Sequence, residues 1–167
     1  AMSTYLYTYV WGFQGVVFVY ATVALFGGVL VAFVAAPRIG KQMSKPRAAA
    51  GAVAIGATLN IAPYALRLLH VLPDVGQPAL LPILLVFFAA ATACNVSAFI
   101  LGASMMADVV EDSEMRTGRR SEGVFFAGSF FVQKCTSGIG IFLAGVILAI
   151  AGFPEKAVPG TVPVDTI

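Results

Sequence analysis

A single lysine, Lys134, interrupts the last long apolar segment of the chain, residues 124–153. It follows Gly123 by eleven residues, which places it ~16 Å along a helix and near the middle of a bilayer core that is ~30 Å thick. An ammonium group at that depth costs at least about 2.5 kcal/mol, so it usually faces a polar cavity or a counter-charge on an ion or solute path. The alternative is a structural lysine that pairs or extends toward the membrane surface.

The counter-charge that Lys134 needs is missing from the apolar segments of this chain. No Asp or Glu occurs in residues 1–72 or 75–107. A carboxylate from another segment or another subunit therefore has to neutralise the lysine. We expect the chain to be part of a larger functional unit whose remaining helices are its partners.

Polar residues near the middle of another apolar segment offer a second candidate site. Asn95 lies between Thr92 and Ser97 in an otherwise apolar stretch. Its amide could form hydrogen bonds with a bound solute, in the same cavity as Lys134. Hydrogen bonds between neighbouring helices are the alternative, and they are equally compatible with these residue types.

The segment 107–123 carries acids where a membrane protein usually carries bases. Asp108, Glu111 and Asp112 share one face if the preceding helix continues past the membrane, and acids at that helix end oppose the helix dipole. An ionic lock that breaks when an inner gate opens would explain them, and a solvated run of charges is the alternative. The basic residues available for compensation are Arg38, Lys41, Arg116, Arg119 and Arg120.

Enzymatic chemistry and a resident metal or cofactor are not expected. The acidic segment lacks the spacing of a calcium-binding loop, and no Ser/His/Asp, Cys/His or phosphate-binding glycine pattern occurs. The lone histidine, His70, lies at a membrane edge. Cys94 and Cys135 fall inside apolar segments, where they are expected to pack as small apolar residues.

Four apolar segments must position these residues. The 167 residues are 59% hydrophobic and only 11% charged, and their net charge of +2 gives no basic surface for nucleic acid. Spans of about 20 apolar residues cross a bilayer. We predict an all-α, polytopic transmembrane bundle forming one partial domain over residues 1–167, with spans at about 16–36, 48–69, 79–106 and 124–153, and with residues 1–11 as the end of a further helix.

The charges flanking these spans predict their orientation. The connection 37–47 carries Arg38, Lys41, Lys45 and Arg47 and no acid, which is typical of a cytoplasmic loop. Alternation then also places residues 107–123 in the cytoplasm. We expect an integral protein of the plasma membrane, or of the inner membrane in a bacterium, surrounded by lipid.

Two stretches resemble a known family. Residues 104–123, SMMADVVEDSEMRTGRRSEG, followed by FVQK at 131–134 and GIG at 138–140, resemble the glycoside-pentoside-hexuronide:cation symporters of the major facilitator superfamily. In that family the loop between helices ten and eleven carries Ala-Asp-x-x-Asp-x-x-Glu, then Arg and Glu. The matching positions here are Asp108, Glu111 (in place of the usual Asp), Glu114, Arg120 and Glu122.

The resemblance also covers Lys134 and part of the basic connection. Lys134 matches a lysine of the eleventh helix that lies near the sugar and cation pocket of the family, and Arg38 to Lys41 is similar to the basic turn between helices eight and nine. The resemblance implies that the chain holds the end of helix seven and helices eight to eleven, within the carboxy-terminal half. The cation-binding carboxylates of the family lie on amino-terminal helices.

The function implied is secondary active transport, in which a sugar or glycoside moves with Na⁺ or H⁺ by alternating access. This segment alone is not expected to transport. Two alternatives stay open at this point: a lysolipid symporter of the same superfamily, which shares an acidic motif and a lysine, and a membrane scaffold that does not transport.

Overall fold

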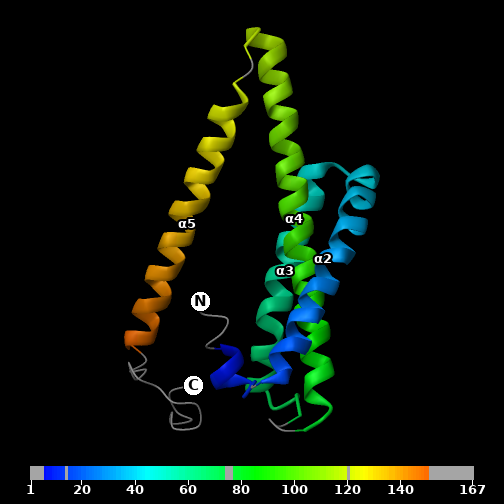
Figure 1. Cartoon of the computed structure of the whole chain (residues 1–167), viewed down its shortest axis with the longest axis vertical. Coiled ribbons are helices and arrows are strands. Elements are labelled where there is room, and N and C mark those ends of the chain that lie inside the picture. The colour runs from blue at the N-terminus through cyan, green and yellow to red at the C-terminus, as the bar shows by residue number, and fades with distance from the viewer. Residues whose placement is uncertain (1–5, 14, 74–76, 120, 151–167) are drawn as a thin grey trace. The chain divides into compact units, whose positions relative to one another are not determined.

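A computed structural model describes residues 6–13, 15–73, 77–119 and 121–150 of the chain. Its regular elements are all helical, which confirms the predicted all-α class, and no strand occurs within these ranges (Figure 1). They are the short π-helix η1 (Leu6–Val10) and the α-helices α2 (Val16–Gln42), α3 (Lys45–Leu68), α4 (Leu80–Thr117) and α5 (Glu122–Ile150).

The four α-helices are long and apolar enough to cross a membrane. The shortest, α3, has 24 residues, and a bilayer span needs about 20. The longest, α4, has 38 residues and extends past the turn that joins α2 to α3 (Figure 1). The acidic residues of the 107–117 stretch thus continue a membrane helix, because α4 ends only at Gly118, whose positive φ of 65° gives the left-handed conformation that terminates it.

The chain divides into two compact units. One comprises Gly15–Arg119 and holds α2, α3 and α4; the other comprises Ala1–Gln14 with Arg120–Ile167 and includes η1 and α5. In the three-helix unit α4 is the shared partner, since it packs along both α2 and α3, whereas α2 and α3 touch each other only slightly (Figure 1). Ala36, Ala48 and Leu101 form the small core in which all three helices meet.

Helix α2 buries a row of small residues within the three-helix unit. Its buried residues are Ala21, Gly28, Ala32 and Ala36, spaced seven, four and four apart and therefore on one face. A Cβ at Gly28 would collide with the backbone carbonyl oxygen of Ala89 in α4. The two backbones thus approach as closely as they do because glycine has no side chain.

Helix α2 also runs through Pro37, where the sequence suggested that the membrane span ends and a connection begins. Membrane helices tolerate a proline although it removes one helical hydrogen bond, here the one to the carbonyl oxygen of Phe33. The guanidinium Nη1 of Arg38 donates to the next carbonyl oxygen, that of Val34, at 3.3 Å. Most of the 37–47 segment is helical, and only Met43 and Ser44 lie between α2 and α3.

Helix α5 is mostly apolar and, among its described residues, none is buried. A helix with that character requires lipid or further helices around it. Its amino end carries Glu122 in the first turn, where a carboxylate interacts favourably with the helix dipole.

Candidate functional site

One acid of the predicted ionic lock, Asp108, forms an ion pair with Lys45. The Nζ of Lys45, the first residue of α3, lies 2.6 Å from Oδ2 of Asp108 in α4. The two side chains are 35% and 57% exposed, so solvent screens the pair. The basic residues that the sequence suggested as partners of these acids were Arg38, Lys41, Arg116, Arg119 and Arg120. The pair between Lys45 and Asp108 was not predicted.

The Lys45–Asp108 pair is a contact within the three-helix unit. The core residue Ala48 follows Lys45 by three positions, and Leu101 precedes Asp108 by seven. Both partners are therefore fixed to helices that are packed together close by. The pair ties α3 to α4 inside one compact unit.

The remaining acids of α4 differ in what surrounds them. Asp112 forms an ion pair with Arg116 one turn later, at 3.0 Å between Nε and Oδ2. Glu111 and Glu114, three residues apart, form no ion pair with any residue that the structure describes. Arg120 lies outside the described residues. The structure thus leaves Glu111 and Glu114 as the acids of this helix without a cationic partner in the described ranges.

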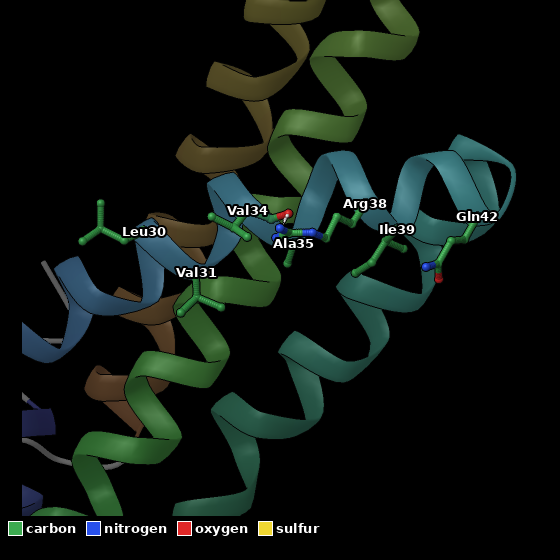
Figure 2. A pocket seen from close by; sticks show the side chains of 7 residues that line it. All are labelled: Leu30, Val31, Val34, Ala35, Arg38, Ile39 and Gln42. Atoms are coloured by element: carbon green, nitrogen blue, oxygen red, sulfur yellow. Dashed lines mark hydrogen bonds between the residues drawn. The ribbon is translucent and has the colours of Figure 1, made fainter.

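The two basic residues expected from α2 are not brought to these acids. Arg38 donates to the Val34 carbonyl instead, and Lys41 makes no ion pair within the described part of the chain. Arg38 borders an open hollow of about 590 Å³ along α2, shown in Figure 2. Its wall is apolar apart from Arg38 and Gln42, and it consists of Leu30, Val31, Val34, Ala35, Arg38, Ile39 and Gln42.

Lys134 lies in the interior of α5, twelve residues after Glu122. Its side chain is exposed, and among the residues described it takes part in no hydrogen bond or ion pair. Gln133, Thr136 and Ser137 are polar neighbours of Lys134 in this helix, and the Thr136 hydroxyl donates to the carbonyl oxygen of Val132 at 2.9 Å. The ammonium group is thus available to a partner that lies elsewhere.

Asn95 lies on α4 against α3, beside the buried Gly56. A Cβ at Gly56 would be 2.7 Å from the Asn95 Oδ1. The amide Nδ2 of Asn60 donates to the carbonyl oxygen of that same Gly56 at 2.7 Å. The structure therefore brings two amide side chains to a single glycine. Of the two, only Asn95 was a candidate from the sequence.

The part of the chain that the structure describes contains no cluster of potential metal ligands. There, no three His, Cys, Asp or Glu side chains come together as potential ligands. The cysteines Cys94 and Cys135 are both free thiols.

Comparison with known proteins gives a family match along nearly the whole chain. Residues 1–165 match the family described as MFS/sugar transport protein. A protein of Synechocystis sp. (strain ATCC 27184 / PCC 6803 / Kazusa), named an uncharacterized symporter, is 40% identical over 85 residues, which are 51% of this chain and 15% of that protein. No solved structure matches the chain. These matches confirm the resemblance inferred from residues 104–140.

Proposed function

We propose that this chain, which belongs to the MFS/sugar transport protein family, is part of a secondary transporter that moves a sugar or glycoside together with Na⁺ or H⁺ by alternating access. The relative from Synechocystis is named a symporter. We propose the same kind of coupled transport for this chain. The family match favours transport over the membrane scaffold that the sequence alone left open.

The observation that carries the proposal is Lys134 in the interior of an apolar helix. Its ammonium group has no partner among the described residues, and the spans of this chain contain no carboxylate. An unpaired charge at that depth costs at least about 2.5 kcal/mol, so we place it in a polar cavity that a carboxylate of the remaining protein completes. A cation or a proton can then compete with the lysine for that carboxylate, which would couple the two fluxes.

The test measures uptake by the complete transporter in proteoliposomes, with an imposed Na⁺ or H⁺ gradient and a panel of radiolabelled mono- and disaccharides. Replacing Lys134 with Ala should lower gradient-driven uptake about tenfold to a hundredfold, as expected when a charged hydrogen bond is lost. Lys134→Arg, which keeps the charge, should retain more of it. Unchanged uptake and unchanged gradient dependence in Lys134→Ala would remove the residue from the mechanism.

The acids on α4 are proposed to serve the inner gate, with distinct roles. Asp108 is tied to Lys45 inside one unit, so this pair is proposed to stay closed while the transporter cycles. Glu111 and Glu114 have no cation in the described part of the chain, and we assign them to pairs that form and break across the gate. Arg38, Lys41, Arg120 and Glu122 remain further candidates for such pairs.

A cross-linking experiment separates a fixed tie from a gate. In a protein without its native cysteines, Lys45→Cys and Asp108→Cys are joined by a short bis-methanethiosulfonate reagent. We expect uptake to continue close to the rate before cross-linking, because the two helices need not part. Arrest of uptake that reverses on reduction would show that α3 and α4 separate during transport, which would contradict the assignment.

A lysolipid is the second candidate solute, and the hollow along α2 is the observation that favours it. Apolar side chains beside the guanidinium group of Arg38 match an acyl chain with a phosphate at one end (Figure 2). Radiolabelled lysophosphatidylethanolamine should be included in the uptake panel. Uptake of this lipid with no sugar uptake would replace the sugar in the proposal, and Arg38→Gln should then weaken lipid uptake.

A further inference from the structure

Two amide side chains from different helices meet at Gly56. Asn60, one turn further along α3, donates its Nδ2 to the Gly56 carbonyl oxygen at 2.7 Å. From α4, the Asn95 Oδ1 would lie only 2.7 Å from a Cβ at Gly56, and the Cys94 Cβ only 3.2 Å from it. The Asn95 side chain therefore occupies space that is open because residue 56 is a glycine.

This cluster lies deep in the predicted membrane region. The Lys45–Asp108 pair joins the same two helices near the predicted membrane edge. Asn60 follows Lys45 by fifteen residues and Asn95 precedes Asp108 by thirteen, which corresponds to ~22 Å and ~20 Å along the two helices. In a hydrocarbon core of ~30 Å, both amides thus lie inside the core, ~8–10 Å from its far side.

The Asn95 amide needs a polar partner at this depth. Its side chain is exposed, and it forms no hydrogen bond with any residue within the described ranges. An amide that is left without a partner in hydrocarbon is strongly unfavourable. Asn95 must therefore face water, a solute or a polar group of another helix.

We propose that Asn95 binds hydroxyl groups of the transported solute, and that Gly56 is the positioning residue that holds its amide in place against α3. An amide both donates and accepts hydrogen bonds, as a hydroxyl does, so a polyhydroxylated solute satisfies both ends of Asn95. The side-chain oxygen of Asn60, Oδ1, takes no part in the bond to Gly56. It adds a hydrogen-bond acceptor near the Asn95 amide. This inference rests on the proposed transport function and specifies part of the solute site.

The first test asks whether position 95 faces water, and it requires no knowledge of the solute. The complete transporter, carrying Cys94→Ala and Cys135→Ala, receives either Asn95→Cys or Val86→Cys, and MTSET is applied to both sides of the proteoliposome membrane. Val86 is the matched control, because it is exposed on the same helix but points in the opposite direction. We expect Asn95→Cys to react roughly tenfold faster or more, because a thiol in hydrocarbon keeps its proton. Equal, slow reaction at both positions would overturn the inference.

The second test concerns Gly56 and uses a matched glycine on the same helix. Gly56→Ala displaces the flexible Asn95 amide and requires only a small shift of the Cys94 Cβ at 3.2 Å, whereas Gly51→Ala meets no atom within 4 Å. For each sugar that the unaltered transporter takes up, Gly56→Ala should raise KM about fivefold to tenfold with little change in the maximal rate, as for one lost hydrogen bond. Gly51→Ala should leave KM unchanged.

A double variant shows whether Gly56 acts through Asn95. In an Asn95→Ala background, Gly56→Ala should cause no further rise in KM, since the displaced amide is already gone. An equal rise in both backgrounds would overturn the positioning role. If Lys134→Ala abolishes uptake while Asn95→Cys stays unreactive, the transport proposal stands and this inference fails.

Discussion

The two interfaces that α4 forms, with α2 and with α3, differ in the kind of atoms that meet. Against α2 it meets Gly28, at a point where backbone faces backbone. Against α3 it meets Gly56, at a point where the nearest atom is the end of the Asn95 side chain. The α3 side also carries the ion pair Lys45–Asp108, whereas every buried residue of α2 is Ala or Gly.

This difference separates a structural contact from one that can hold chemistry. Backbone atoms in contact cannot rearrange without moving a whole helix, so the α2–α4 contact fixes the geometry of the unit. A polar side chain beside a glycine can change its partner by rotating about its own bonds. We therefore expect substitutions at the α2–α4 contact to affect stability first, and substitutions at the α3–α4 contact to affect solute handling first.

Gly28→Ala should give the largest change in stability. Its Cβ would collide with the carbonyl oxygen of Ala89, which cannot turn away, and overpacking of this kind costs about 1–3 kcal/mol. Gly27→Ala is the control, because a Cβ at the neighbouring Gly27 meets no atom within 4 Å. Thermal unfolding of the detergent-solubilised transporter measures both. Equal midpoints for the two variants would refute the close backbone contact.

The tie between Lys45 and Asp108 should contribute less. Exposed ion pairs contribute about 0.2–1 kcal/mol, and 57% of the Asp108 side chain is exposed. A double-mutant cycle with Lys45→Met and Asp108→Asn should give a coupling energy in that range, and high salt should reduce it. A coupling energy of zero at low salt would show that the pair does not tie α3 to α4.

The pair between Asp112 and Arg116 should have the smallest effect. It joins neighbouring turns of one helix with both side chains largely in solvent, and such pairs contribute about 0.3–0.5 kcal/mol. Asp112→Ala should barely change the unfolding midpoint. In contrast, Glu111→Ala should leave stability unchanged and alter the uptake rate, since Glu111 has no partner inside the described part of the chain. A larger loss of stability from Asp112→Ala than from Gly28→Ala would reverse the proposed ranking.

The membrane helices could be predicted from the sequence because they depend on local composition. Runs of about 20 apolar residues are sufficient to identify a span. Helix ends were harder to place. The helix α2 continues past Pro37 to Gln42, although a proline often marks the end of a helix in a sequence.

The tertiary contacts of the site could not be predicted, because they join residues far apart in the chain. Lys45 and Asp108 are 63 positions apart, and the segment 37–47 carries four basic residues that charge alone does not distinguish. Gly56 gave no signal either, since it lies in a stretch where Ala and Gly are common. Lys134 was found because a charge in an apolar span is conspicuous without any knowledge of its neighbours.

Thiol labelling at Lys134→Cys tests the central claim most directly. In the complete transporter without native cysteines, we expect MTSET to react with this thiol and a transported sugar or the coupling cation to slow the reaction. A thiol in a lipid-facing position would keep its proton and react slowly. Failure of MTSET to react from either side of the membrane would contradict the placement of Lys134 in the solute path.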